Sequence, residues 1–396
     1  MENNEQGDFT YLLEQFADIK IMAYPVPGID SLSIDQKKLV YFLSQAALCG
    51  RDIIFDQNYK HNLRIRKTLE AIHNSYTGDR QTDDFKQFVI YLKRVWFSNG
   101  IHHHYSTDKI KPGFSEPYFF ELVRKSSGAV FPLNSGQDIS MFIDEMTAIL
   151  FDPEIAPKRV SLDSDNDLIT ASACNFYEGV TQEQAESFYA ALKDPSDEKP
   201  VSFGLNSRLV QVNGDVREEV YRVGGLYSKA LEKIIMWLEK ALDVAENDIQ
   251  RATIQKLIDF YRSGNLKAFD EYNVLWVGDL ISQVDFVSGF IEVYGDPLGM
   301  KATWESVVNF KDVEATKRTE IISANAQWFE DHSPIDDRFK KREVKGVSAK
   351  VITVAQLGGD CYPSTPIGIN LPNADWIRKE YGSKSVSYTH LRAHET

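Results

Sequence analysis

One long amphipathic pattern limits the fold more than any other feature of this sequence. Between residues 226 and 263, apolar residues recur at spacings of three and four. This stripe is typical of one amphipathic helix or of a tight helical pair, and Gly264 follows as the residue expected just past a helix end. Such a stripe must be buried against other elements, so we interpret it as part of a core rather than as a cofactor site.

Capping residues predict three further helices. A Ser or Thr just before a helix accepts hydrogen bonds from the free N–H groups of its first turn, and a Gln three residues later completes a capping box. The predicted helices and the residues that begin them are 34–49 after Ser33, 83–99 after Thr82, and 182–194 after Thr181 with Gln184 in its first turn.

Strand patterns are interleaved with these helices. An Asn-Gly pair at 213–214 lies between two extended runs and predicts a hairpin. Residues 284–295 and 349–359 have the β-branched and aromatic composition of strands. Residues 304–329 have a helical pattern, and a polar, basic loop follows at 332–350. Because helices and strands do not alternate regularly, the predicted fold class is α+β rather than a doubly wound sheet.

The charge balance disfavours some classes of partner. The 396 residues include 58 acidic and 44 basic ones, and the net charge is −14. This balance argues against nucleic acid and against an anionic membrane surface as partners, whereas a cationic substrate or a free amine fits it. No apolar run approaches the roughly 18 residues of a membrane span, and no export signal is visible. The three sparse cysteines indicate free thiols, so we expect a cytoplasmic protein.

The histidines offer two weak metal motifs. His102–His104 are adjacent, so they cannot all face one metal from an extended segment, and no further ligand follows at a zinc spacing. We expect a polar loop whose rings pack beside Tyr105. His390 and His394 are four apart, but Leu391 stands where H-E-x-x-H requires a glutamate. Walker, dinucleotide-binding and G-x-S-x-G motifs do not occur either.

A carboxylate and a phenol lie close together near the strand pattern that ends at 295. If the strand continues this far, Glu292 and Tyr294 project from one face, while Ile291 and Val293 project from the other. A carboxylate beside a phenol can accept an ammonium group and donate to a carbonyl. The alternative is a surface glutamate at a strand end, before the Gly-Asp-Pro turn at 295–297.

Two amides flank a proline further along the chain. Pro372 has a fixed φ, and the rigid turn that it makes can aim Asn370 and Asn373 into one cleft. The alternative is an Asx-turn that caps the helix expected to begin near Ala374.

Together these segments resemble the dipeptidyl peptidase III family. The motifs that carry the resemblance are Gly-Phe-Ile-Glu-x-Tyr at 289–294 and Asn-x-Pro-Asn at 370–373. The stretches at 48–62 and 225–241 are similar to the bacterial branch of the family. The resemblance extends from about residue 8 to residue 387.

The resemblance implies a zinc-dependent aminopeptidase that removes dipeptides from the N-terminus of short peptides. It implies two lobes around a wide cleft, a mixed substrate-side lobe with a β-barrel-like core and a mainly helical zinc lobe. By resemblance, Glu292 and Asn373 bind the α-ammonium group of the peptide and Asn370 assists. Tyr294 hydrogen-bonds the peptide near the scissile bond, and the peptide adds as a strand to a sheet edge.

The family's zinc motifs, H-E-x-x-G-H and E-E-x-[RK]-A-[ED], do not occur in this sequence. We therefore expect no catalytic residue and no metal ligand in this chain, because zinc and its ligands belong to the full-length family member. The expected division is 1–312 as substrate-side lobe, 313–352 as a helical excursion into the zinc lobe, 353–387 as the return, and 388–396 as a foreign tail.

Two functions remain open at this point. The chain is either the N-terminal part of a zinc dipeptidyl peptidase that is inert by itself, or a zinc-free paralogue that binds peptide N-termini without cutting them. In both cases the expected partners are short peptides with a free N-terminus, with no nucleic acid and no membrane. The sequence does not indicate an oligomeric state.

Overall fold

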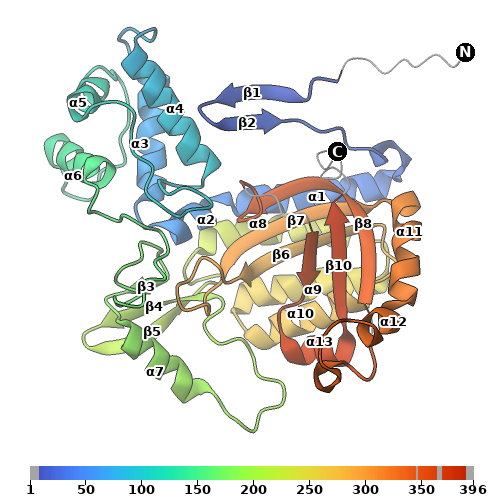
Figure 1. Cartoon of the computed structure of the whole chain (residues 1–396). Helices are drawn as coiled ribbons and strands as arrows, with labels where there is room; N and C mark the ends of the chain where they lie inside the picture. Colours follow the sequence, from blue (N-terminus) through green and yellow to red (C-terminus); the bar gives the residue numbers. More distant parts are fainter. Residues whose placement is uncertain (1–8, 345–346, 364–367, 389–396) are drawn as a thin grey trace, which may run out of the picture. The chain divides into compact units, whose positions relative to one another are not determined.

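The computed structural model describes residues 9–344, 347–363 and 368–388. They belong to two compact units. The first unit comprises the chain up to Pro27 together with His61–Arg159, and the second comprises Gly28–Lys60 and the chain from Val160 onward (Figure 1). Within the described residues, no helix combines the length and the hydropathy that a membrane crossing requires. Of the expected foreign tail at 388–396, residues 389–396, with His390 and His394, lie outside the described residues, whereas Tyr388 is the last residue of a described strand.

The first unit consists of a hairpin and a group of helices. Its elements are β1 (Leu12–Phe16), β2 (Ile19–Met22), α3 (Asn62–Ser75), α4 (Asp83–Phe97), α5 (Glu116–Arg124) and α6 (Ile139–Phe151). Thr82 accepts a hydrogen bond from the Phe85 N–H at 3.2 Å, which confirms the predicted start of α4. The ring of Phe88 packs against those of Phe85 and Phe114, with centroids 5.7 and 5.8 Å apart. The apolar face of α4 is thereby buried.

The adjacent histidines of the first unit lie in a packed loop. Nε2 of His102 is 2.9 Å from the carbonyl oxygen of Ala156, and burial lowers the pKa of His102 to about 4. The rings of His103 and His104 stack with centroids 4.4 Å apart, and Tyr105 packs against His104 at 5.3 Å. The expectation that these rings pack beside Tyr105 is confirmed.

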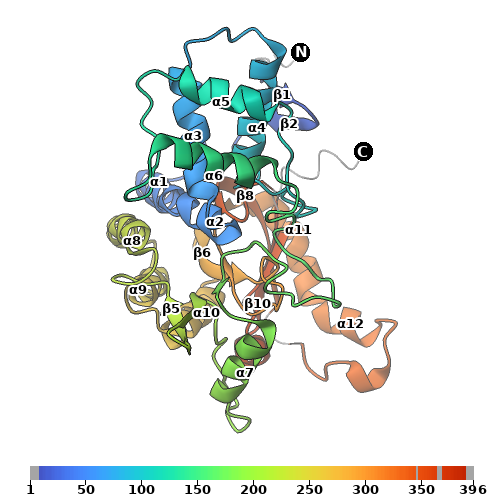
Figure 2. The same ribbon diagram turned by 90° about the vertical axis from the view of Figure 1, so that its left-hand side faces the viewer.

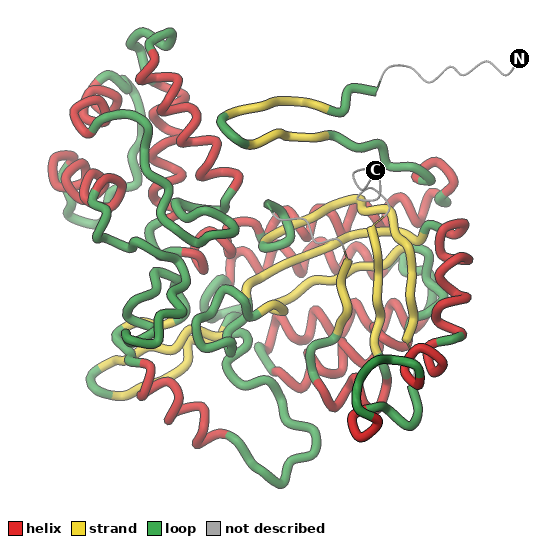
Figure 3. The backbone as a smooth tube through the Cα atoms, in the orientation of Figure 1, coloured by secondary structure: helices red, strands yellow, loops and turns green. Residues whose placement is uncertain are grey.

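The second unit is organised around a five-stranded sheet (Figure 3). In spatial order its strands are β6 (Val284–Glu292), β7 (Thr303–Lys311), β8 (Val347–Gly359), β10 (Ser383–Tyr388) and β9 (Gly368–Leu371). β8 and β10 are parallel, and the other neighbouring strands are antiparallel. The two strands predicted near 284–295 and 349–359 are therefore confirmed, and in the described sheet β6 and β9 are the edges.

This sheet is strongly coiled. In Figure 1, β6 and β7 run across the view, β9 and β10 are nearly upright with opposite directions, and β8 bends from one direction into the other. Two contacts join strands that are not neighbours. Nζ of the fully buried Lys384 on β10 lies 3.0 Å from Oδ2 of Asp285 on β6, and Nδ2 of Asn373, just past β9, lies 3.4 Å from the carbonyl oxygen of Ile291. No ladder of hydrogen bonds joins β6 to β9 in the described part, so the barrel-like core remains a prediction.

Helices cover the sheet and complete the α+β class that the sequence predicts. The helices of the second unit are α1 (Ile34–Cys49), α2 (Arg51–Asn58), α7 (Gln182–Leu192), α8 (Ser228–Leu242), α9 (Asp248–Ser263), α10 (Leu266–Gly278), α11 (Val313–Ala324), α12 (Ala326–Asp331) and α13 (Asp375–Tyr381), with short 3-10 turns at Ile29–Ser31 and Asp337–Phe339. α1 contacts β6, β7 and β8, α8 packs on α1, and α9 lies between α8 and α10 (Figure 2). The capping box predicted at the start of α7 is present, and Ser33 caps α1 as predicted, in a capping box with Gln36.

The long amphipathic run is a helical pair. α8 ends at Leu242 and α9 begins at Asp248, where the side chain of Asn247 accepts a hydrogen bond from the Gln250 N–H at 2.9 Å. Gly264 ends α9 with a φ of 70°, as expected for the residue past a helix end. The inward residues of both helices belong to the main core of the unit, so the interpretation of the stripe as core is confirmed.

A small three-stranded sheet completes the second unit. β4 (Ser207–Val212) and β5 (Asp215–Val220) form the predicted hairpin, and β3 (Tyr177–Glu178) pairs with β4. The turn residues Asn213 and Gly214 have φ values of 53° and 92°, which is the left-handed pair that an Asn-Gly hairpin requires.

The prediction of one helix over 304–329 is wrong in its first part. Residues 303–311 form β7, whose side chains are buried from Thr303 to Phe310. A strand buried on both faces shows no alternation of apolar and polar residues. Trp304, Val307 and Val308 therefore have the spacing of a helix by coincidence. The helical part begins only at Val313.

We predict that Gly50→Ala destabilises the fold. A Cβ at Gly50 would lie 2.2 Å from the six-membered ring of the fully buried Trp304, and overpacking of this kind costs about 1–3 kcal/mol. Denaturant unfolding should show the lower free energy of unfolding. Gly278→Ala is the control, because a Cβ there meets nothing within 4 Å. Equal stability of the two variants would contradict the predicted clash.

Candidate functional site

A cleft of about 860 Å³ opens in the second unit beside the end of β6. Its walls come from α7 and the loop that follows it, from residues 200–205, and from the turn after β6. Glu292, Tyr294 and Asn373 line the cleft, whereas Asn370 does not. The fold thus brings together three of the four residues that the sequence singles out.

A β-bulge positions Glu292. Phe290 pairs with Trp304 and Glu292 pairs with Thr303, so Ile291 is an extra residue in β6. Such a bulge bends the strand and re-aims the side chains that follow. Phe290 and Ile291 are consequently both buried, and Glu292 emerges half-buried at the cleft.

The strand does not continue to Tyr294, contrary to the premise of the sequence analysis. β6 ends at Glu292, and the Asp296 N–H donates to the Val293 carbonyl oxygen at 3.1 Å, which closes a turn. Tyr294 lies in this turn and is 83% exposed. Glu292 and Tyr294 therefore share a cleft without sharing a strand face.

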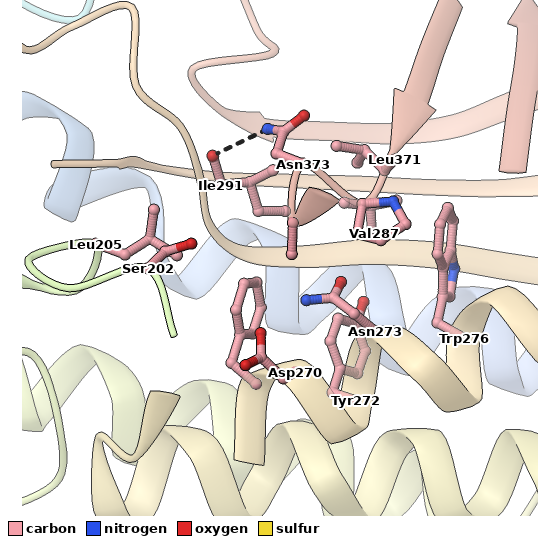
Figure 4. A pocket seen from close by; sticks show the side chains of 13 residues that line it. Ser202, Leu205, Asp270, Tyr272, Asn273, Trp276, Val287, Ile291, Leu371 and Asn373 are labelled. Carbon is pink, nitrogen blue, oxygen red and sulfur yellow. Dashed lines mark hydrogen bonds between the residues drawn. The ribbon is translucent and has the colours of Figure 1, made fainter. Parts of the chain in front are cut away.

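Asn373 connects the two edges of the five-stranded sheet. Its Nδ2 donates to the main-chain oxygen of Ile291, as the dashed line in Figure 4 marks. The alternative, an Asx-turn that caps the next helix, is wrong. The N-cap residue of α13 is Ala374, and no side chain forms a capping hydrogen bond there. Asn370 has a different place. Its Oδ1 accepts a hydrogen bond from Ser385 Oγ at 3.1 Å, between β9 and β10.

The carboxyl group of Glu292 lacks a compensating positive charge. Burial raises its pKa, the amide of Asn373 lowers it, and the neighbouring carboxyl of Asp360 raises it again. Among the described residues, no cationic side chain contributes to this pKa. A cation placed beside Glu292 would therefore stabilise its ionised form.

Two more carboxyl groups surround Glu292. Oγ1 of Thr303 lies 3.1 Å from the main-chain oxygen of Glu292 and 3.0 Å from Oδ2 of Asp360, and can donate to either. Glu305 is buried on β7 and accepts a hydrogen bond from Cys361 Sγ at 3.1 Å. Burial raises the pKa of Glu305 to about 8, so it holds a proton at neutral pH.

Hydrogen bonds to Asp296 hold the turn that carries Tyr294. Oδ2 of Asp296 accepts the N–H groups of Met300 and Lys301 at 2.8 Å each, and the Tyr177 hydroxyl at 3.0 Å. Nζ of the buried Lys301 donates to the Tyr189 hydroxyl at 2.6 Å. Met300 and Tyr189 both line the cleft. This network holds part of the cleft wall in place.

The described residues do not fit a zinc site. No group of three or more His, Cys, Asp or Glu side chains among them is arranged to hold a metal ion. The cysteines Cys49, Cys174 and Cys361 are free thiols, as expected, although Cys49 is only partly buried. No chemistry assigned to this cleft therefore passes through a metal.

Sequence reasoning missed Thr303, Glu305 and Asp360. Glu305 was hidden by the helical interpretation of 304–329, and Thr303 directly precedes that range. Only a strand paired with β6 brings these two residues beside Glu292. Asp360 follows β8, and its N–H donates to the carbonyl oxygen of Trp304 at 3.1 Å. No local sequence pattern predicts that contact, because it depends on the pairing of β7 with β8.

We predict that Glu305→Gln reduces the pH dependence of stability. Between the ordinary pKa of a glutamate, 4.5, and the folded value of about 8, the folded protein keeps a proton that the unfolded chain has lost. The free energy of unfolding therefore falls as pH rises, by up to about 1.4 kcal/mol per pH unit. Glutamine mimics the protonated acid and removes this slope.

Urea unfolding at pH 5, 6.5 and 8 measures the effect. The variant should gain stability relative to the unchanged chain as pH rises, with the largest gain at pH 8. The exposed Glu183→Gln is the control, and its profile should follow that of the unchanged chain. Parallel profiles for all three proteins would contradict a proton on Glu305.

Comparison with known proteins agrees with the motifs. Residues 201–395 match peptidase family M49. The chain is 33% identical over 168 residues to dipeptidyl peptidase 3 of Dictyostelium discoideum, over 42% of this chain and 23% of that protein. It is 28% identical over 169 residues to the human dipeptidyl peptidase 3, over 43% of this chain and 22% of that protein. The chain thus matches about a quarter of the length of these curated relatives.

A solved structure shares the fold. The structure of dipeptidyl peptidase III from Caldithrix abyssi aligns with a TM-score of 0.64 and 20% identity, over 92% of this chain and 56% of that one. At this identity the likeness concerns the fold alone. Glu292, Tyr294 and Asn373 all lie inside the segment that matches peptidase family M49. These matches confirm the resemblance: residues 201–395 match peptidase family M49, and the chain is similar to dipeptidyl peptidase 3 proteins.

Proposed function

We propose that this chain binds the free N-terminus of short peptides, as the substrate-side part of a zinc-dependent dipeptidyl peptidase. The observation that carries the proposal is the shared cleft. Glu292 from one sheet edge and Asn373 from beyond the other line the same hollow. The relatives of peptidase family M49 support a peptidase as the parent protein.

The ammonium group of a peptide finds complementary acceptors in this cleft. An α-ammonium group has three N–H donors, and the carboxylate of Glu292 can accept from it with a charge-assisted hydrogen bond. Because Nδ2 of Asn373 already donates to Ile291, its Oδ1 remains an acceptor for the same group. Binding requires ionised Glu292. Because Glu292 becomes ionised as the pH passes its raised pKa, peptide affinity rises over the same pH range.

The rest of the peptide extends along a sheet edge. β6 and β9 are the edge strands of the described sheet, and β6 ends at Glu292 while β9 leads to Asn373. Addition of a strand to such an edge binds the peptide main chain with little dependence on side chains. The exposed hydroxyl of Tyr294 is a donor for a peptide carbonyl further along. Asn370 assists from within the sheet, where Ser385 holds it.

The proposed lobes keep the division read from the sequence. Residues 1–312 and 353–387 belong to the substrate-side lobe, and 313–352, which contain α11 and α12, form the excursion toward a zinc lobe. No H-E-x-x-G-H motif occurs in the sequence. We therefore assign binding to this chain and no step of hydrolysis.

The same missing motif favours a second candidate function, a zinc-free protein that binds peptide N-termini without cutting them. The two candidates differ in the gene. If the gene encodes an H-E-x-x-G-H motif in frame after Ser387, the peptidase is supported. If the natural gene has a stop codon there instead, the binding protein is supported.

We predict that Glu292→Gln weakens peptide binding by about tenfold or more, since it removes a charge-assisted hydrogen bond. Calorimetric titration with a tetrapeptide measures the dissociation constant. Asn373→Ala should weaken binding less, and Asn370→Ala least, because Asn370 does not line the cleft. The N-acetylated tetrapeptide is the matched ligand control. Equal affinity for the free and the acetylated peptide would overturn the ammonium clamp.

We also predict that the purified chain with added zinc does not hydrolyse dipeptidyl-arylamides, because the sequence has no H-E-x-x-G-H motif to supply ligands. Release of the arylamine is followed by absorbance or fluorescence, with the tetrapeptide titration on the same sample to show that it is folded. Turnover that a chelator abolishes would contradict the assignment of binding alone.

A further inference from the structure

The second unit contains another pocket, of about 560 Å³, between α9, α10, α13 and residues 197–199. None of Glu292, Tyr294 and Asn373 lines it. Its volume lies in the range of small-molecule sites. The pocket is therefore large enough for a ligand. It shares Asp197 with the cleft described above, and Asp270 also lines a small cavity beside Asn373.

Some charged side chains of this pocket form ion pairs, and others do not. Lys199 pairs with Glu380 at 2.6 Å, and Lys256 pairs with Glu271 at 2.5 Å. Within the described part of the chain, Lys267 and Asp270 form no ion pair, either with each other or with another residue. They lie three residues apart on α10 and both line the pocket.

Asp270 is the more informative of the two. It is only 9% exposed, and no described residue donates a hydrogen bond to its carboxyl group. Burial alone raises its pKa, to about 7. A buried carboxyl without a donor is costly, so the pocket wall holds an acceptor that a ligand cation can satisfy.

The opposite wall is aromatic. The rings of Trp376 and Tyr381 on α13 lie edge to face with centroids 6.3 Å apart. Val274 and Leu275 add apolar surface on α10, the helix that carries Asp270. The pocket thus offers apolar surface on which a ring can pack.

We propose that this pocket binds a small zwitterion with an aromatic side chain, either an amino acid or a dipeptide. The ligand ammonium pairs with Asp270, its carboxylate pairs with Lys267, and its ring packs on the wall formed by Trp376 and Tyr381. One turn of helix separates the acid from the base, which suits a molecule that carries both charges close together. A longer peptide, whose two ends lie far apart, does not match this spacing.

Calorimetric titration of the full chain with L-phenylalanine and with Ala-Phe tests the proposal. Both are zwitterions, and the tighter binder identifies an amino acid or a dipeptide as the source. Phenylalanine amide lacks the carboxylate and N-acetylphenylalanine lacks the ammonium group. Each of these analogues should bind about tenfold more weakly than phenylalanine. No heat from either zwitterion at millimolar concentration would overturn the proposal.

Matched variants test whether the zwitterion binds in this pocket. Asp270→Asn and Lys267→Gln should each raise the dissociation constant about tenfold or more. The controls are Asp243→Asn and Lys233→Gln, which make the same charge changes at exposed positions in and just after α8 and should leave binding unchanged. Thermal melting shows whether each variant is folded. A folded Asp270→Asn variant with full affinity would refute the assignment.

Glu292→Gln separates the two pockets. It should leave zwitterion binding unchanged while it weakens tetrapeptide binding. Loss of both in this variant would mean that phenylalanine and Ala-Phe occupy the cleft, and the second pocket would then not be a zwitterion site. Loss of neither would count against the peptide clamp and leave the second pocket supported.

Discussion

The buried pair of Lys384 and Asp285 maintains the coiled shape on which the rest of the second unit depends. Lys384 lies on β10 and Asp285 on β6, two strands that are not neighbours in the sheet. Removing two charges from water is costly unless further hydrogen bonds satisfy them. Trp276 supplies one by donating to Oδ1 of Asp285 at 2.9 Å, and Lys350 adds a second positive charge 4.0 Å from Oδ2. A flat sheet could not bring β6 and β10 into contact.

The candidate peptide site follows from this coil. Its two main groups come from opposite edges of the sheet, Glu292 from the end of β6 and Asn373 from beyond β9. The hydrogen bond from Asn373 to Ile291 spans the gap between the edges, where no ladder exists in the described sheet. The bulge at Ile291 then turns Glu292 toward the cleft. The proposed clamp would therefore be a property of the whole sheet and not of either short motif.

Local signals were sufficient for much of the fold. Capping residues such as Ser33 and Thr181 act within one turn, so their helices can be predicted from a few residues. The same holds for the Asn-Gly hairpin. The strand β7 could not be predicted in this way, because both of its faces are buried and the alternation that identifies a strand disappears.

The candidate site was only partly predictable for a related reason. Glu292 and Asn373 stand out as polar groups in short motifs, and the resemblance to a family adds their roles. Neither the bulge at Ile291 nor the turn that carries Tyr294 has a sequence signature here. Glu305 and Asp360 reach the site only through the pairing of β6, β7 and β8. Contacts between strands distant in sequence leave no local pattern to interpret.

The carboxyl groups near Glu292 bear on the proposed recognition of a single positive charge. If Glu292, Glu305 and Asp360 were all ionised, their mutual repulsion would oppose folding. Burial keeps Glu305 protonated at neutral pH, which lowers this repulsion. No basic group contributes to the pKa of Glu292, whereas the second pocket presents both Asp270 and Lys267. One hollow is thus suited to the ammonium end of a chain, and the other to a molecule that carries both charges together.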